Sequence, residues 1–469
     1  MSYPARMNRK LVYLTIFLEG YVVLAIELLL MRQLTPFVGS ATDIFAIIIA
    51  AVLLPLAVGY HMGGRTAVNL TPETARSMLT RNFTIAALFF MVGLVHIHLN
   101  IFFTLLDSVF GGNHWLKTGV YCAVFALYPV YLLGQTVPIL SVAMPKDDLS
   151  RTTGTMLFYS TLGSFCGSIF STLVLMAWIG VHNTFNVTLG LLLLLIALLG
   201  WGRNRSAVAG ALIIGLYVVT TNSDYALRQL GIVQNNTYSQ VDVMTTKEGA
   251  RHFRINHSSS SAIYPTEQKY HAYVNFIDRH LIGNMPGDAP KTILVIGAGG
   301  FTQGRDDPKN IYTYIDIDPD LQATAEKYFL KEPLGPNKLF VAQSARSFLR
   351  ANAMPYDMII VDAYSNHLSI PQDLVTVEFF RQVKEHLKPG GMMVMNVVTS
   401  PIFADTFSRT IDGTLREVFP LLSRNVIYQG HKPDMPANVI YVYSHNPPEE
   451  APKRPYTDLL NRYFLHTGR

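Results

Sequence analysis

The residues that could do chemistry lie in the second half of the chain, where glycines and carboxylates follow short apolar runs. Gly297 and Gly299 come directly after the β-branched run 292–296, and Asp316 lies near the end of a second such run, 311–317. A glycine turn after a strand lets backbone N–H groups approach a ligand, and the carboxylate after the next strand can accept hydrogen bonds from both hydroxyls of a ribose. The spacing predicts a nucleotide-binding α/β unit, although a flavodoxin-like sheet with a tight turn would show a similar pattern.

Repeated strand–turn–helix units predict how these side chains are positioned. Strands are expected in 292–296, 311–317, 338–350 (which runs on into a helix), 356–363 and 392–398, and helices over 321–330 and 377–391. This alternation indicates a doubly wound parallel sheet. Ligands of such sheets bind outside the carboxyl ends of the strands. We therefore expect Gly297, Asp316, Gln343 and Asp362 to lie along one edge of the sheet.

The composition divides the chain into two unlike halves. Of the 469 residues, 50% are hydrophobic and 15% are charged; residues 1–222 hold 12 Lys+Arg and 7 Asp+Glu, and the remainder holds 25 of each, so the net charge of +5 belongs to the first half. A neutral polar half gives no support for nucleic-acid binding. Cys122 and Cys166 both lie in apolar segments and indicate neither a disulfide framework nor a metal site.

Seven apolar stretches dominate the first half. They cover approximately 11–31, 42–62, 83–106, 119–144, 154–181, 185–201 and 207–221. Crossing a hydrocarbon core takes about 20 helical residues, and most of these stretches are long enough. The alternative is a set of buried helices in a large soluble protein, but seven such runs leave no polar face to meet water. The pattern predicts a multi-span α-helical membrane bundle whose partner is the lipid bilayer, and the long apolar N-terminal run is not typical of a cleavable signal peptide.

Basic residues predict the orientation of the bundle. Ten of them fall on one side of the predicted spans: Arg6, Arg9, Lys10, Arg65, Arg76, Arg81, Lys146, Arg151, Arg203 and Arg205. Only Arg32 and Lys117 lie toward the other side. By the positive-inside rule the N-terminus is cytoplasmic, in a multi-pass protein of the inner (plasma) membrane. If 207–221 crosses, the C-terminal domain lies outside the cytoplasm; if this stretch is re-entrant or interfacial, the domain stays inside.

Two carboxylates, Glu19 and Glu27, lie within the first apolar stretch. Their eight-residue spacing brings them within about 80° of each other on a helix. They could line a polar cavity or a substrate path. The simpler interpretation is that Glu19 reaches water near a helix end and that Glu27 interacts with a neighbouring helix; we favour it for Glu19 but not for Glu27.

The remaining segments complete the domain organisation. Residues 235–246 and 251–264 alternate as strands of a small sheet, and the apolar spacing over 267–282 predicts a helix. The Pro-rich segment after Asn446 predicts an exposed tail. We therefore expect a transmembrane helical domain at 1–222, a small β-sheet subdomain with a helix at 232–290, a Rossmann-like nucleoside-binding domain at 291–445 and a tail at 446–469.

Several ordered motifs of the second half resemble the spermidine synthase (polyamine aminopropyltransferase) family. The matching segments include TYSQVDV, EQKYHAYV, ILVIGAGG, YIDIDPDLQATAEKYF, YDMIIVDAYSNHLSIP and FFRQVKEHLKPGG, in the order and spacing of the family. The first half resembles the membrane-embedded branch of the same family. The resemblance implies a membrane bundle fused to a small β-sheet and an α/β Rossmann-like domain of the methyltransferase and spermidine synthase type.

The resemblance also implies roles for individual residues. The ribose-binding acid corresponds to Asp316 and the glycine turn to Gly297 and Gly299. The glutamine and histidine at the amino-acid end of the donor correspond to Gln240 and His271. The residue pair that reads adenine corresponds to Ala342 and Gln343. The acid that acts on the attacking amine corresponds to Asp362, followed by Tyr364; a purely structural cap at a strand end is the alternative for Asp362.

The chain departs from the family pattern at three carboxylates. Gly300 stands where the glycine turn normally carries an aspartate for the amine of the donor, Gln343 replaces the acid of the adenine-reading pair, and Ser365 replaces the second acid of the motif that begins at Asp362. These losses weaken the expectation of a standard diamine acceptor.

Three hypotheses about function follow. The first is a membrane enzyme that alkylates a small amine or similar nucleophile with an adenosyl sulfonium donor, either decarboxylated S-adenosylmethionine or S-adenosylmethionine, with no tightly bound cofactor and with a homodimer left open. The second is a methyltransferase acting on a lipid or other membrane substrate. The third is a non-catalytic sensor that binds a nucleoside or polyamine and is coupled to the bundle.

Overall fold

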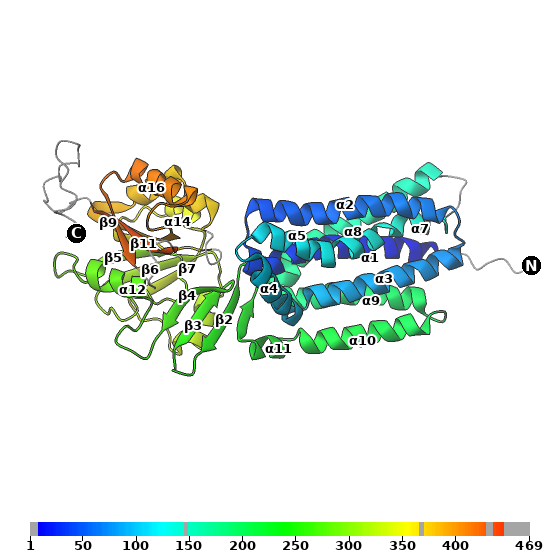
Figure 1. Cartoon of the computed structure of the whole chain (residues 1–469), viewed down its shortest axis with the longest axis horizontal. Coiled ribbons are helices and arrows are strands. Elements are labelled where there is room, and N and C mark those ends of the chain that lie inside the picture. Colours follow the sequence, from blue (N-terminus) through cyan, green and yellow to red (C-terminus); the bar gives the residue numbers. More distant parts are fainter. Residues whose placement is uncertain (1–7, 145–148, 365–369, 428–434, 445–469) are drawn as a thin grey trace, which may run out of the picture.

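The computed structural model describes residues 8–144, 149–364, 370–427 and 435–444. The predicted tail at 446–469 and Ser365 lie outside these residues. A helical bundle forms one end of the molecule and an α/β domain the other (Figure 1). The bundle helices are α1 (Arg9–Val38), α2 (Thr42–Ala67), α3 (Pro72–Leu94), α4 (His96–Phe110), α5 (His114–Phe125), α6 (Leu127–Gly134), α7 (Thr136–Ser141), α8 (Leu149–Ile169), α9 (Met176–Gly200), α10 (Arg205–Thr221) and the short α11 (Asp224–Gln229).

Within the described residues, four helical runs are long and apolar enough to cross a membrane, or five if α5 and the bent continuation through α7 count as one. One of the four, Ser150–Gly200, contains a break at Gly180, whose φ of 78° and ψ of 170° are not helical. The predicted third stretch, 83–106, also differs: α3 begins earlier, at Pro72, and Val95 separates it from α4. Non-helical backbone at Val95 and Gly180 interrupts helices that the apolar composition alone would continue.

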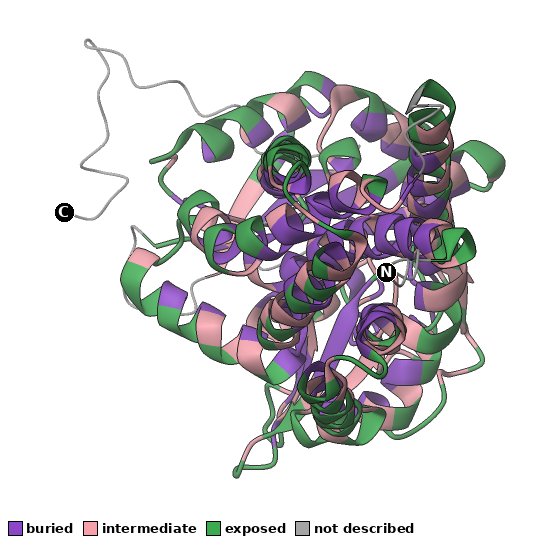
Figure 2. Ribbon diagram, turned by 90° about the vertical axis from the view of Figure 1, so that its right-hand side faces the viewer, coloured by how far each residue is buried: buried purple, intermediate pink, exposed green. Residues whose placement is uncertain are grey.

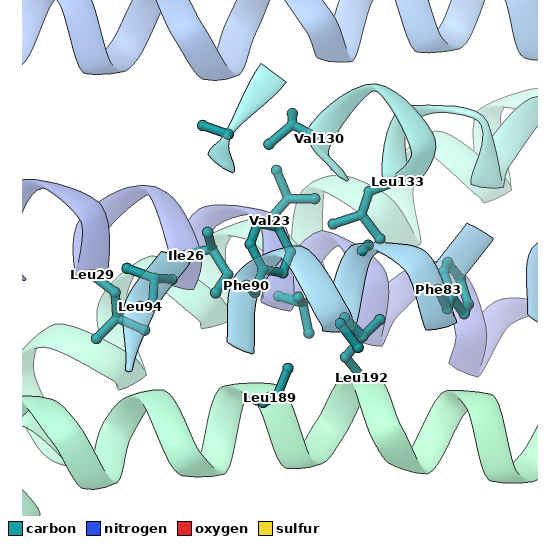
Figure 3. Packing of buried hydrophobic residues seen from close by; sticks show 14 of the residues in the cluster. Val23, Ile26, Leu29, Phe83, Phe90, Leu94, Val130, Leu133, Leu189 and Leu192 are labelled. Carbon is teal, nitrogen blue, oxygen red and sulfur yellow. The ribbon is translucent and has the colours of Figure 1, made fainter. Parts of the chain in front are cut away.

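The bundle core is apolar and tightly packed. Figure 3 shows side chains of α1, α3, α6 and α9 meeting in its interior, and Figure 2 shows buried residues gathered where the helices face one another. Gly163 and Gly167 of α8 bring α8 against α1, because a Cβ at these positions would lie 2.0 Å from the Phe17 carbonyl oxygen and 2.3 Å from that of Tyr21. These glycines allow the close backbone approach typical of membrane helices.

Glu19 does not reach water, contrary to the favoured interpretation. Its side chain is buried inside the bundle, 1% exposed, and Oε2 has no hydrogen-bond partner among the described residues. Gly20, the next residue, packs directly on the backbone of Ser160 in α8, where a Cβ would lie 2.4 Å from the Ser160 oxygen. The helix end that would have let Glu19 reach the surface lies ten residues earlier, at Arg9.

The C-terminal part holds two sheets. The first has the order β1-β2-β3-β4 and is antiparallel, with β1 (Ile232–Asn235), β2 (Gln240–Thr245), β3 (Arg251–Ile255) and β4 (Ser258–Ile263). The second has the order β10-β11-β9-β8-β5-β6-β7, with β5 (Thr292–Ile296), β6 (Ile311–Asp316), β7 (Lys338–Ala342), β8 (Tyr356–Val361), β9 (Leu387–Thr399), β10 (Leu422–Ile427) and β11 (Ala437–Ser444). The helices of this part include α12 (Ala272–Phe276), α13 (Leu321–Thr324), α14 (Ala345–Ala351), α15 (Val377–Glu385) and α16 (Thr406–Val418).

The structure corrects three predictions in this part. The large sheet is mixed, because β11 runs antiparallel to both β9 and β10, so the expectation of a wholly parallel sheet was wrong. The helix predicted over 267–282 begins at Ala272, after His271 in an extended conformation. The helix predicted over 377–391 ends at Glu385, and the glycines 390–391 belong to β9, which pairs with both β8 and β11.

The α/β domain contacts the bundle through the β1–β2 and β3–β4 turns of its small sheet. Arg32 of α1 donates from Nε to the Asn236 carbonyl oxygen at 2.9 Å, and Asn236 donates from Nδ2 to Asp318 at 2.8 Å, just after β6. The ring of His257, in the β3–β4 turn, lies 4.8 Å from that of Phe37 at the end of α1. The edge expected to bind ligands therefore faces the bundle.

Candidate active site

A cavity of about 530 Å³ lies at the carboxyl edge of the large sheet, in the range that holds small ligands. Seven of the eight predicted site residues line it: His271, Gly297, Gly299, Asp316, Gln343, Asp362 and Tyr364. The carboxyl ends of β5, β6 and β8 bring most of them together, as parallel pairing requires. Gln240 is not among the lining residues. It lies buried at the start of β2, where its backbone N–H donates to Asn256 Oδ1 at 3.0 Å.

Asp362 lies just past the end of β8 and is held by two neutral donors. The Tyr273 hydroxyl donates to its Oδ2 at 2.8 Å, and Asn396 Nδ2 donates to its Oδ1 at 2.9 Å. Burial raises the pKa of Asp362 above its ordinary value, while the hydrogen bonds from Asn396 and Tyr273 lower it. Because no cation among the described residues is bonded to it, the carboxylate is a stronger base than an exposed aspartate and has a defined orientation.

Tyr273 and Asn396 were missed in the sequence analysis, although a signal for one of them exists. Asn396 interrupts the apolar run 392–398, and a polar residue within a buried strand usually has a specific partner. Tyr273 has no comparable signal, because its position suits an apolar helix face equally well. Tyr364 is bonded to the same strand, β9: its hydroxyl donates to the Asn396 carbonyl oxygen at 3.2 Å and accepts from the Val398 N–H at 2.7 Å.

Asp316, the predicted ribose-binding acid, lies at the carboxyl end of β6 and lines the cavity. Its Oδ2 accepts from the Ala298 N–H at 3.1 Å, and its Oδ1 accepts from the Asp318 N–H at 3.2 Å. Burial raises the pKa of Asp316 to about 6, against the lowering effect of these backbone donors. Each carboxylate oxygen has a second lone pair, so both can still accept a hydrogen bond from a ribose hydroxyl.

Donor affinity should therefore fall as the pH drops below about 6. Protonation removes the negative charge of Asp316, to which the ribose hydroxyls would donate. Methylthioadenosine itself does not titrate in this range. Its Kd should therefore rise by up to tenfold per pH unit between pH 6 and 5. Calorimetric titration of the detergent-purified chain at each pH measures this change. Asp316→Asn, which cannot ionise, should show a flat profile; an equal slope in that variant would assign the effect to another group.

Gly297 and Gly299 lie where other segments of the chain pack very close to the glycine turn. Gly297 has a φ of +92°, and a Cβ there would lie 2.3 Å from the Asp362 carbonyl oxygen. Gly299 has a φ of +52°, and its Cβ would lie 2.7 Å from Ser260 Oγ. The turn therefore places β8 and β4 directly against the glycine loop, and only glycine is accommodated without strain.

The departure at Gly300 has a steric cause. A Cβ on Gly300 would lie 2.7 Å from the Phe329 ring and 2.9 Å from the Ser261 Cβ, and Gly300 does not line the cavity. The aspartate usual at this position in the spermidine synthase family therefore cannot enter without displacing packed groups.

Replacing Gly300 with aspartate should destabilise the chain by about 2 kcal/mol or more rather than restore a family contact, because overpacking and a buried charge both cost free energy. Thermal unfolding in detergent would show a lower Tm. Gly413→Asp is the matched control, since a Cβ at Gly413 meets nothing within 4 Å. An unchanged Tm together with tighter donor binding by Gly300→Asp would show that the turn can accept the carboxylate.

The electrostatic character of the cavity suits a cation. Its lining includes the carboxylates of Asp316, Asp362 and Asp373, and no lysine or arginine among the described residues. Burial lowers the pKa of His271 to about 4, so this side chain is neutral at neutral pH. Its ring nitrogens lie 3.2 Å from Ser259 Oγ and 3.4 Å from the Tyr264 hydroxyl.

This fold and site define an α/β domain with a cavity at the carboxyl edge of its large sheet and a buried carboxylate, Asp362, in the lining. Residues 275–444 match the model of the spermine/spermidine synthase domain, so the C-terminal half of the chain carries a domain of that family. The probable polyamine aminopropyl transferase of Bifidobacterium longum (strain NCC 2705) is 30% identical over 148 residues, which cover 31% of this chain and 32% of that protein. The polyamine aminopropyltransferase of Oceanobacillus iheyensis is 26% identical over 330 residues, covering 62% of each.

Among solved structures, a probable spermidine synthase from Corynebacterium glutamicum is similar, with 22% identity, a TM-score of 0.39 and coverage of 45% of this chain and 78% of the other. The chain thus spans from about a third to less than two thirds of the length of these two curated relatives.

Proposed function

We propose that the chain is an integral membrane transferase that uses an S-adenosyl sulfonium donor, preferably decarboxylated S-adenosylmethionine, to transfer an aminopropyl group to an amine. The observation that carries this proposal is the pairing of two carboxylates, Asp316 and Asp362, in one cavity without a neighbouring lysine or arginine in the described lining. Asp316 would hold the ribose and Asp362 would face the reacting amine. The family of the domain and the aminopropyltransferase names of its relatives support the same reaction.

The chemistry needs a neutral amine held in line with a carbon–sulfur bond. Asp362 would take one proton from the acceptor, whose nitrogen then attacks the carbon next to the sulfonium. The new C–N bond forms as the C–S bond breaks, and methylthioadenosine leaves with the electron pair on sulfur. Positive charge passes from sulfur to nitrogen, and the proton held on the Asp362 carboxylate leaves that side chain neutral. Tyr273 and Asn396 keep that carboxylate in one orientation through the step.

The bundle supports a membrane location. Large apolar side chains remain exposed on its outer surface, among them Leu54, Phe165, Leu173 and Leu212, each more than half exposed. Water would not stabilise so large an apolar surface, but a bilayer would. We propose a multi-pass protein of the inner (plasma) membrane with its N-terminus in the cytoplasm.

Product analysis tests the reaction. The full-length chain in detergent is incubated with decarboxylated S-adenosylmethionine or S-adenosylmethionine and a panel of amines, and the nucleoside products are separated by mass. Methylthioadenosine formed with decarboxylated donor supports aminopropyl transfer. S-adenosylhomocysteine instead would establish methyl transfer and overturn the proposal. Failure of calorimetry to detect binding of either donor or its nucleoside product would contradict both reactions and favour a non-catalytic sensor.

A further inference from the structure

The path of α10 determines on which side of the bundle the α/β domain lies. α10 starts near α3 and the end of α9: a Cβ on Gly200 would lie 3.1 Å from Val208 and 3.5 Å from Thr80. It ends at Asn222, whose Nδ2 donates to the His182 carbonyl oxygen at 3.1 Å. Its 17 residues rise about 25 Å, so α10 runs along the bundle from one end to the other.

The chain also reverses direction at Gly180. Gly163 contacts Phe17 and Gly167 contacts Tyr21, so α8 runs parallel to α1 and toward the α/β domain. Gly180 reaches that domain, where its Cβ would lie 2.9 Å from the Asn235 carbonyl oxygen. Beyond it α9 returns, because its Leu199 carbonyl oxygen accepts from Arg76 Nε near the start of α3. The run Ser150–Gly200 is therefore two passes in opposite directions.

These reversals make the number of passes odd. α1, α2, α3, the bent series α5 to α7, α8, α9 and α10 each run along the described bundle and alternate in direction. The start of α1 consequently lies at the end of the bundle away from the α/β domain, as Figure 1 shows. We name that end the distal end, and the end that contacts the α/β domain the domain end.

The cationic residues of the bundle gather at the distal end. In the described part they are Arg9, Lys10, Arg65, Arg76, Arg81, Arg151, Arg203 and Arg205, against the single carboxylate of Glu73. The domain end has three cations, Arg32, Lys117 and Arg228, against Asp43, Asp107 and Asp224. Two of those cations already have partners, because Lys117 pairs with Asp107 at 2.6 Å and Arg32 donates to Asn236. The charge asymmetry of the bundle therefore lies almost entirely at the distal end.

The three tryptophans indicate where the two surfaces of the bilayer lie along the bundle. Trp115 and Trp178 are exposed near the domain end, and Trp201 is exposed at the distal end. Tryptophan favours the two membrane–water interfaces. The 20 residues between Gly180 and Trp201 rise about 30 Å, which is the thickness of a hydrocarbon core. The α/β domain therefore begins where the bilayer ends, next to Gly180.

We propose that the α/β domain lies on the extracytoplasmic face of the membrane and meets its substrates there. Positively charged loops remain in the cytoplasm, so the distal end faces the cytoplasm and the domain end the opposite compartment. The location of the domain does not depend on the proposed function, but the following consequence for the donor rests on it. A cationic nucleoside does not cross a bilayer unaided, so a transport step that exports the sulfonium donor must precede the transfer.

Site-specific labelling tests the topology. Cys122 and Cys166 are replaced by alanine and serine, and single cysteines are introduced as Glu248→Cys, in the exposed β2–β3 turn, and Val68→Cys, 82% exposed in the α2–α3 turn at the distal end. A membrane-impermeant maleimide is applied to spheroplasts of a bacterial host before and after permeabilisation. We expect Glu248→Cys to react in intact spheroplasts and Val68→Cys to react only after permeabilisation.

Every other pattern overturns the inference. Reversed labelling would place the α/β domain in the cytoplasm, and equal accessibility of the two positions would show that α10 does not cross. An unchanged Tm of both variants in detergent confirms that the labelled chains are folded. The result is independent of catalysis: the expected labelling without transfer would contradict the proposed function alone, and transfer with reversed labelling would contradict the topology alone.

Discussion

Replacing Asp362 with asparagine should lower turnover by about a hundredfold or more while leaving donor binding within about twofold. General base catalysis contributes typically 10²–10⁴-fold, and asparagine cannot accept the proton of the attacking amine. The two side chains have nearly the same shape, so Tyr273 and Asn396 can still surround the position. Methylthioadenosine release measures turnover, and calorimetry with methylthioadenosine measures binding.

Asp373→Asn is the matched control for Asp362. Asp373 also lines the cavity and carries the same charge, but it shows no hydrogen bond to Tyr273 or Asn396 among the described contacts. Its replacement should therefore change turnover only slightly. Full turnover in Asp362→Asn would contradict the base assignment and favour a structural cap at the end of β8. An equal loss in both variants would show that total negative charge, rather than proton transfer, is what matters.

Replacing Asp316 with alanine should raise the Kd of methylthioadenosine by about a hundredfold or more. Hydrogen bonds to a charged group contribute about 1.5–3 kcal/mol each, and two ribose hydroxyls would lose their acceptor. Calorimetry measures the change. Because Asp316 also accepts from the Ala298 and Asp318 N–H groups, the Tm of the variant must be compared with that of the native chain.

Asp316→Glu separates recognition from local packing. Glutamate keeps the charge on a longer side chain. It should bind within about tenfold of the native chain. Unchanged binding by Asp316→Ala would show that the ribose lies elsewhere. Equal weakening in the alanine and glutamate variants would assign the loss to the geometry of the glycine turn rather than to hydrogen bonding.

The local sequence determined the elements and the edge of the sheet on which the site lies. Apolar runs long enough for helices, β-branched runs followed by glycine or aspartate, and repeated strand–helix alternation are periodic patterns within short segments. Parallel pairing then aligns strand ends, so Gly297, Asp316 and Asp362 come together without knowledge of any longer contact. The cavity follows from that alignment.

The tertiary structure alone decided which groups act on one another. Tyr273 and Asn396 meet Asp362 across sequence separations of 89 and 34 residues, and no local pattern specifies such pairings. Packing of Phe329 excludes a side chain at Gly300, and pairing of β11 between β9 and β10 makes the sheet mixed. The sequence left the course of 207–221 open, because a stretch of this length can cross, lie flat or turn back. In the packed bundle this stretch contacts both ends, so it takes the chain from the distal end to the domain end.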